Sequence, residues 1–488
     1  MNKADKQTLI TKTAICTVFL VGLLIRVAAA AAFSFWLDEA AMFFTSRYNV
    51  TDLLLLQHWN VSHPPLYLLF LHFWQMLGSS EIFLRLPSLL FSGVTLYVSY
   101  IIGCRLKNRV FGLILLSIFA FSNYLISFSW QANTYALAVM LALLTVYYYF
   151  FRTENLYSAV ILIILMLAGM FSDYGFVWLI FSLIIFELSV YFLTYRKINN
   201  YFKARRFHLF SLIFSSAVVV AWGIYYVPKL PEALTLISWL PSGNLLLKSL
   251  NDFIRISYSF DLKTLLLLTA SISGIYAGFS LKSRINKSFV IFILISITFP
   301  LATAYAYSLF QQPVLISRHF FVSGLGLLFG LAYFVYYSRK LWAVPVIVVY
   351  LLAGLSGLPG LGKLGVDDFN WKKSAHIITE YEEMHTSELN FFIDAGNNRH
   401  FFRTLRYYLE LEGNNTPDMV IPKDNHELNQ IIHATADRKN FRLWYFDFKG
   451  SGKNLTIPPS FLCTDIREYT VGEDTRFLNC KLTLVNSP

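Results

Sequence analysis

Long apolar runs, separated by short polar stretches, dominate the first 360 residues of the chain. A helix that crosses a bilayer needs about 20 mostly apolar residues, and on this basis the pattern predicts roughly eleven spanning helices. The expected spans lie near residues 14–36, 84–104, 110–129, 134–151, 157–173, 175–195, 208–228, 264–281, 288–310, 319–337 and 341–358. The pattern therefore predicts an α-helical polytopic membrane protein.

Lys and Arg residues gather between the apolar runs, and this fixes an expected orientation. Cytoplasmic loops carry an excess of these residues. With a cytoplasmic N-terminus, every basic cluster falls on the cytoplasmic side, at 3–12, 105–109, 196–206, 282–287 and 339–340. Three longer stretches then lie on the other side of the membrane: 37–83, 229–263 and everything after about 360.

Composition supports this interpretation. The chain is 56% hydrophobic and 14% charged, and its mean hydropathy of +0.53 is too high for a soluble protein of ordinary surface. The formal net charge of +11 would otherwise suggest nucleic acid as a partner. Because the cations lie in short clusters beside apolar segments, we assign them to membrane topology and expect contact with lipids, not nucleic acid.

Arg26 interrupts the first apolar run. A charged residue in a bilayer is costly, so it should face the bundle interior and have an acidic or backbone partner. The run could also be a secretory signal, since it starts with basic residues and contains the small-residue stretch "AAAAA". Arg26 and the aromatic "FSFW" that follows favour an uncleaved helix.

A break in character near residue 360 predicts a domain boundary. The Gly-rich stretch "LPGLGKLGVDDFN" is followed by polar sequence of ordinary charge content, so 1–360 is expected to be the membrane domain and 361–488 a soluble domain. Helical spacing in 371–384, 399–413 and 425–438, with strand patterns in 389–396, 441–448 and 480–486, predicts a small α/β fold. Cys463 and Cys480 lie in this region, and whether they form a disulfide is open.

The first external loop, 37–83, has the pattern of short helices, not of a disordered connection. Asp38, Thr51 and Ser62 each precede a helical run and are expected to be N-cap residues. Asp38 and Glu39 would then lie at the mouth of the bundle. The helix that begins near His63 would be able to approach this acid pair.

Such an arrangement suits the transfer of a sugar from a polyprenyl phosphate. The acceptor hydroxyl must lose a proton as it attacks the anomeric carbon, and Asp38 or Glu39 can accept that proton. The departing phosphate needs cationic or hydrogen-bonding partners. Candidates on the same side of the membrane are His63, Arg85, Lys229, Arg318 and His319.

The segments "LDEA", "HPPLYLLFLHFW", "SSEIFLRLPSLLF" and "SRHFF" resemble the bacterial relatives of the protein-O-mannosyltransferases, the family-39 glycosyltransferases with the GT-C membrane fold. The lipid A aminoarabinose transferase is a more distant member of that group. The resemblance is strongest over the first 140 residues and returns at "FNWKKSAHII" after the last apolar run. It implies a bacterial inner membrane protein whose C-terminal domain is periplasmic or extracellular.

By this resemblance Asp38 is the catalytic base and Glu39 its partner, while His63, Arg85, Arg318 and His319 bind the donor phosphate. In "SWQANTYAL" only Tyr135 matches the family pattern, because Gln131 and Asn133 stand where charged residues are usual. Asp173 stands where a histidine is common. Tyr135, Asp173 and Lys229 are weaker candidates for contacts with the substrate.

Three functions are compatible with the pattern. The leading hypothesis is an inverting glycosyltransferase with a polyprenyl-phosphate-linked sugar donor and a lipid, glycan or protein acceptor. A transporter or flippase for lipid-linked glycans would place ionisable residues deep in several helices and often has an internal repeat, which is not found here. A polymerase or ligase with a lipid-diphosphate donor remains an alternative. No HExxH motif or zinc-type Cys spacing occurs, so we expect no metal and no other cofactor.

Overall fold

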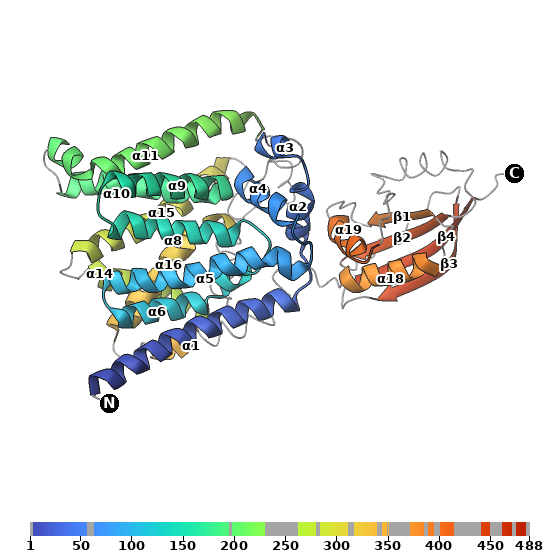
Figure 1. The fold of residues 1–488 in the computed structure, drawn as a ribbon, viewed down its shortest axis with the longest axis horizontal. Coiled ribbons are helices and arrows are strands. Elements are labelled where there is room, and N and C mark those ends of the chain that lie inside the picture. Colours follow the sequence, from blue (N-terminus) through green and yellow to red (C-terminus); the bar gives the residue numbers. More distant parts are fainter. Residues whose placement is uncertain are drawn as a thin grey trace. The chain divides into compact units, whose positions relative to one another are not determined.

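The computed structural model divides the chain into two compact units (Figure 1). The helical unit comprises residues 1–32, 45–77 and 82–361, and the C-terminal unit comprises 33–44, 78–81 and 362–488. The first external loop is thus shared between the units, whereas the sequence pattern assigned all of it to the membrane domain. The structure describes residues 3–55, 63–194, 198–229, 262–279, 284–310, 317–338, 344–348, 350, 371–384, 389–394, 401–413, 441–448, 461–470 and 475–484.

The helices of the helical unit follow the apolar runs of the sequence. They include α1 (Lys3–Ala32), α5 (Glu81–Leu106), α6 (Arg109–Ala120), α7 (Asn123–Ser129), α8 (Tyr135–Phe151), α9 (Leu156–Ser172), α10 (Val177–Thr194), α11 (Ile198–Tyr226), α14 (Leu262–Phe279), α15 (Arg284–Phe310) and α16 (Phe321–Tyr337). Each expected span up to 319–337 coincides with a helix or, for 110–129, with the bent pair α6 and α7. The last expected span, 341–358, lies mostly outside the described residues.

Within the described residues, five helices are long and apolar enough to cross a membrane: α1, α5, α10, α11 and α15. The pair α6 and α7, bent by 61°, counts as a sixth if it is one span. Helices α8, α9 and α16 are also apolar but shorter, with 17 residues each. The predicted class, an α-helical membrane protein, is confirmed.

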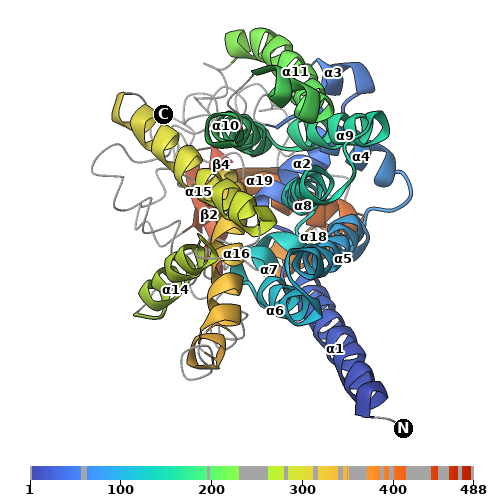
Figure 2. The same cartoon turned by 90° about the vertical axis from the view of Figure 1, so that its left-hand side faces the viewer.

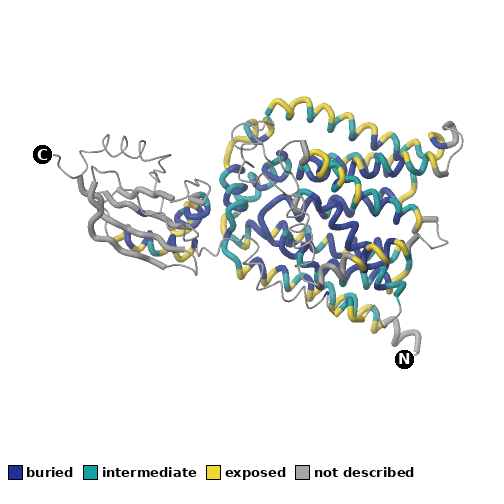
Figure 3. Tube along the Cα trace, turned by 180° about the vertical axis from the view of Figure 1, so that it is seen from behind, coloured by how far each residue is buried: buried dark blue, intermediate teal, exposed yellow. Residues whose placement is uncertain are grey.

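Helix α8 lies near the centre of the bundle, among α5, α9, α10 and α16 (Figure 2). Buried residues fill this interior, while exposed apolar residues follow the outer side of α11 (Figure 3). Small residues allow the closest helix contact: a Cβ atom on Gly274 of α14 would lie 2.1 Å from the Gly330 carbonyl oxygen of α16. Close packing of this kind is typical of helices in membranes.

Arg26 has the backbone partners that the sequence argument required. Its guanidinium is 1% exposed and donates to the carbonyl oxygens of Gly22 and Ala120, both at 2.8 Å, and of Phe119 at 3.0 Å. Phe119 and Ala120 end α6, where the last carbonyls have no partner within the helix. Arg26 therefore satisfies the end of α6 at the bend into α7.

A second group of ionisable residues joins α8, α10 and α11, and we call it the Glu187 cluster. Glu187 accepts hydrogen bonds from Tyr149, from Tyr201 at 3.0 Å and from Arg205 at 2.5 Å. Arg205 and His208 also lie 3.9 and 2.9 Å from the carboxylate of Glu154. Burial by itself raises the pKa of Glu154, but His208 and Arg205 lower this pKa below its ordinary value.

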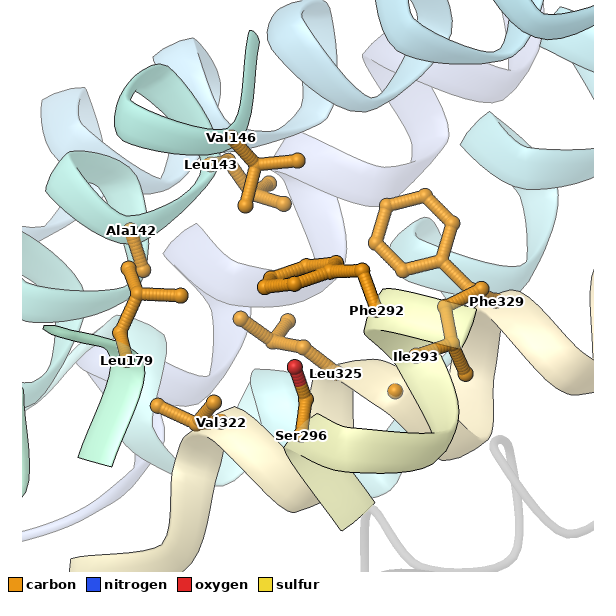
Figure 4. A pocket seen from close by; sticks show the side chains of 11 residues that line it. Ala142, Leu143, Val146, Leu179, Phe292, Ile293, Ser296, Val322, Leu325 and Phe329 are labelled. Atoms are coloured by element: carbon orange, nitrogen blue, oxygen red, sulfur yellow. The ribbon is translucent and has the colours of Figure 1, made fainter. Parts of the chain in front are cut away.

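A small cavity lies between α8, α10, α15 and α16 (Figure 4). Its lining is apolar except for Ser296, whose hydroxyl is buried without a hydrogen-bond partner. The backbone carbonyl of the same residue accepts a hydrogen bond from Ser323 at 3.0 Å. The two serines therefore differ in hydrogen bonding although both belong to the packed interior.

The C-terminal unit is a small α/β fold. Its four strands, β1 (Leu389–Asp394), β2 (Phe441–Phe448), β3 (Phe461–Thr470) and β4 (Thr475–Leu484), pair in the order β1-β2-β4-β3. Strand β1 is parallel to β2, and the other pairs are antiparallel. Tyr381 of α18 (Trp371–Met384) packs edge-on against Trp444 of β2, with ring centroids 5.4 Å apart, so this helix lies on the sheet.

The expected helices 371–384 and 399–413 correspond to α18 and α19 (Phe401–Leu411), and the three expected strands to β1, β2 and β4. The sequence pattern missed β3, and the expected helix 425–438 lies outside the described residues. The register of β3 and β4 sets Cys463 opposite Leu482, two positions from Cys480 along β4. A Cys463–Cys480 disulfide stays a prediction.

Candidate functional site

The acid pair lies in the first turn of α2 (Leu37–Thr45), within the C-terminal unit. The backbone N–H of Trp36 donates to Oε2 of Glu39 at 2.9 Å, and the Ala40 N–H donates to the Trp36 carbonyl. A Glu that reaches back from the third helical position to the N-cap N–H is half of a capping box. Glu39 is fully buried and Asp38 is half-buried, so Glu39 stabilises the helix start while Asp38 keeps access to solvent.

Asp38 is the second residue of α2, so the prediction of Asp38 as its N-cap was wrong. The next helix also begins at another residue than expected, and the expected N-cap Ser62 lies outside the described residues. Helix α3 (Val50–Leu54) has Asn49 as its N-cap, whose side chain accepts from the Asp52 N–H at 2.8 Å. The prediction of Thr51 at this position was wrong, because Asn49 supplies the acceptor two residues earlier. Helix α4 (Pro65–Trp74) follows Pro64, which provides no side-chain cap. Half-buried His63 directly precedes Pro64.

Arg85 is a fully buried cation on α5. Its guanidinium donates to the Ala30 carbonyl at 2.8 Å and lies 4.8 Å from the ring centre of Trp130. A cation over an indole face is stabilised by the ring quadrupole. Arg85 thus links α1 and α5 to the segment 130–134 between α7 and α8, which we call the polar loop.

The polar loop is buried throughout, and it contacts Asp173 at the end of α9. The Thr134 hydroxyl donates to Oδ2 of Asp173 at 2.8 Å, and the Gly175 N–H donates to Oδ1 at 2.8 Å. Asp173 is 4% exposed and caps the short helix η2 (Tyr174–Phe176). These contacts join the connection between α7 and α8 to the connection between α9 and α10.

Two amide side chains of the polar loop have atoms without a partner. Gln131 donates from Nε2 to the Ser127 carbonyl at 2.8 Å, but its Oε1 accepts nothing. Asn133 accepts from the Thr134 N–H at 2.6 Å, but its Nδ2 donates to nothing. Both side chains are at most 2% exposed. Buried polar atoms nearly always have a partner in the protein or in ordered water, so Oε1 of Gln131 and Nδ2 of Asn133 each have an unused hydrogen-bonding capacity.

The helix η4 (Ser317–Phe320) meets η2 at Gly175. A Cβ atom on Gly175 would lie 2.7 Å from the His319 carbonyl oxygen and 2.9 Å from Oδ1 of Asp173, so only glycine fits here. His319 is therefore beside Asp173 in the helical unit. The backbone of Arg318 belongs to η4, while its side chain lies outside the described part.

The remaining candidates are Tyr135 and Lys229. Tyr135 begins α8 next to the polar loop and is 4% exposed. Nζ of Lys229 donates to the Leu55 carbonyl at 2.6 Å and to the Tyr225 hydroxyl at 2.9 Å. Lys229 therefore attaches the end of α11 to the end of α3. Among the described side chains, no group of three His, Cys, Asp or Glu residues has the geometry of a metal site.

Structural comparison gives the clearest relationship. Over 98% of both chains the protein aligns with ArnT from Cupriavidus metallidurans, at 14% identity, with a TM-score of 0.59 for the apo state and 0.56 for the form bound to undecaprenyl phosphate. The chain therefore shares the fold of ArnT. No protein-family model matches the chain, and no curated protein matches it in sequence.

Sequence reasoning named the acid pair and the cations as candidates, which stay predictions, but it gave no role to two further sets of residues. It treated Gln131 and Asn133 only as departures from a family pattern, although two amides in a short connection between apolar runs are themselves a signal of a polar site. It also gave no role to the tyrosines of α19. Their neighbours lie more than 300 residues away in the sequence, and no local pattern indicates such a contact.

Proposed function

We propose that this protein is an integral membrane glycosyltransferase that transfers a sugar from a polyprenyl-phosphate-linked donor to a hydroxyl acceptor, with inversion at the anomeric carbon. The reaction occurs on the non-cytoplasmic face of a bacterial inner membrane. In this proposal the N-terminus is cytoplasmic and the C-terminal unit is periplasmic or extracellular. Residues 1–360 form the transferase domain, and the first external loop of this domain, 37–83, carries Asp38.

The observation that carries the proposal is the GT-C fold combined with an aspartate in the first turn of the first external helix. A helix N-terminus favours an ionised carboxylate. Glu39, whose carboxylate accepts the Trp36 N–H, fixes the start of that helix, and Asp38 next to it is half-buried. Asp38 is therefore the general base, and Glu39 holds it in position.

In the transfer step the acceptor oxygen attacks the anomeric carbon and its proton passes to the Asp38 carboxylate. The bond between that carbon and the phosphate oxygen breaks, and polyprenyl phosphate leaves with the electron pair. Cations and N–H donors stabilise the departing negative charge. We assign this role to His63, Arg85, Arg318 and His319, and support for a lipid-phosphate leaving group comes from the ArnT structure bound to undecaprenyl phosphate.

The polar loop is proposed to contact the sugar. Sugar hydroxyls both donate and accept hydrogen bonds, and the loop offers one acceptor, Oε1 of Gln131, and one donor, Nδ2 of Asn133, that have no partner. Tyr135 and Asp173 complete this part of the site in our proposal. Lys229 is the weakest candidate, because its ammonium group already holds a backbone carbonyl.

The test is an assay of the purified protein in lipid vesicles, with defined sugar donors linked to either polyprenyl phosphate or polyprenyl diphosphate. We expect transfer from the monophosphate, and Asp38→Asn should lower the rate about 100- to 10,000-fold because it removes the general base. The matched control is Asp52→Asn, an acid in the first turn of the neighbouring α3, which should retain wild-type activity. An active Asp38→Asn variant refutes the proposed base, and transfer from the diphosphate alone supports the ligase alternative.

A further inference from the structure

Helix α19 of the C-terminal unit contacts both flanks of the acid helix α2. On the N-terminal flank the Tyr407 ring stacks on Phe35, with centroids 4.2 Å apart and planes at 18°. On the far side the same tyrosine meets Phe43 edge-on at 5.1 Å and 85°. Asp38 and Glu39 lie between these two phenylalanines in the sequence, so one tyrosine side chain spans the acid pair.

Backbone hydrogen bonds reinforce the ring contacts. The Phe35 N–H donates to the Tyr408 hydroxyl at 2.5 Å, and the Tyr407 hydroxyl donates to the Ser79 carbonyl at 2.8 Å. Thus the Tyr408 hydroxyl accepts a hydrogen bond from the Phe35 N–H, two residues before the helix begins. The next N–H, that of Trp36, donates to the Glu39 carboxylate. The two donors at the helix entry are both satisfied, one by Glu39 of α2 and the other by Tyr408 of α19.

These contacts are buried. Phe35, Phe43, Tyr407 and Tyr408 are each at most 2% exposed. A buried N–H that loses its partner is destabilising, and an aromatic pair stabilises beyond its buried area. Arg406 lies 5.1 Å above the Phe44 ring but is itself exposed, so its contribution is small.

We infer that Tyr407 and Tyr408 are positioning residues for the acid pair, so that the C-terminal unit is required for the chemical step and not only for acceptor choice. The inference rests on the proposed function of Asp38. It gives the domain after residue 360 a role other than recognition or cover: its helix α19 fixes where the base stands. A base displaced by about 1 Å loses on the order of 100-fold in rate.

The experiment compares Tyr407→Leu, Tyr407→Phe and Tyr408→Phe in the full-length protein. Tyr407→Leu should lower kcat about 100-fold with KM for the donor nearly unchanged. Tyr407→Phe keeps the ring contacts and should restore most of this loss, whereas Tyr408→Phe leaves the Phe35 N–H unpaired and should lower kcat. Tyr381→Leu, which disturbs the contact with Trp444 but does not touch α2, is the control and should keep kcat.

Hydrogen exchange gives a readout that needs no substrate. Tyr407→Leu and Tyr408→Phe should speed amide exchange in residues 33–44, while exchange in α8 and α9 stays as in the wild type. Unchanged exchange in 33–44, an unchanged kcat, or an equal loss of kcat in Tyr381→Leu would each overturn the inference. If Asp38→Asn is inactive and Tyr407→Leu is fully active, only the positioning role fails; if Asp38→Asn is active, the proposed function itself fails.

Discussion

The Glu187 cluster and the polar loop are both buried in the helical unit, yet their polar atoms are used differently. The carboxylate of Glu187 accepts from two tyrosines and one arginine, so the charge is compensated inside the protein. The polar loop leaves Oε1 of Gln131 and Nδ2 of Asn133 without partners. A satisfied network stabilises a fold, whereas an incomplete one is available to a ligand.

The position of each group along the bundle agrees with this difference. In the Glu187 cluster, Arg205 lies in the basic segment 196–206 and His208 directly after it, and the charge pattern assigns this segment to the cytoplasmic side. The polar loop and Asp173 lie at the opposite ends of α8 and α9, the ends proposed to face the sugar donor. Both groups are buried, so the two differ in their hydrogen bonds and in their position along the bundle, not in burial.

The largest expected effect on stability comes from breaking the Glu187 cluster. Arg205→Met leaves the 2% exposed carboxylate of Glu187 without its cation, and we expect a loss of about 3 kcal/mol in unfolding free energy. Arg206→Met, an exposed neighbour on the same helix, should change it by less than about 0.5 kcal/mol. Chemical unfolding in detergent micelles measures both. Equal stability of the two variants would contradict a structural role for the cluster.

A smaller effect on stability, joined to a clear effect on activity, is expected in the polar loop. Asn133→Ala removes the acceptor of the Thr134 N–H and should cost about 1 kcal/mol, while the lost ligand contact lowers kcat/KM about tenfold.

Asn155→Ala is the matched control, because this N-cap of α9 accepts from the Ser158 N–H and should also cost about 1 kcal/mol. Transfer assays together with unfolding curves separate the two asparagines. The comparison fails if both variants lose activity to the same degree, or if neither does.

The smallest effect is expected at the cavity between α8, α10, α15 and α16. Ser296→Ala removes a hydroxyl that has no partner, so stability should change by less than about 0.5 kcal/mol or rise slightly. Ser323→Ala removes the donor to the Ser296 carbonyl and should cost about 0.6 kcal/mol. Thermal unfolding in detergent ranks the pair, and a larger loss in Ser296→Ala would indicate that the cavity holds an ordered polar partner.

Much of the helical unit was predictable because span length and apolar content are local properties of the chain. The runs at 84–104 and 157–173 end within a few residues of α5 and α9. The need of Arg26 for a partner was also predictable, since any buried guanidinium has it. The identity of the partners of Arg26 was not predictable. They include the last carbonyls of α6, which are exposed by the bend between α6 and α7, and the continuous apolar run 110–129 does not indicate that bend.

By itself the sequence determined that this is a membrane protein of many helices, with one acid pair directly after the first of them. Only the tertiary structure decided that Glu39 caps α2 and that one atom of each amide in the polar loop lacks a partner. It also decided that tyrosines of α19 contact Phe35, of which Tyr408, the hydrogen-bonded one, is 373 residues away in the sequence. The physical reason is that hydropathy and helix signals act over one or two turns, whereas a hydrogen-bond partner depends on which distant segments share the same space.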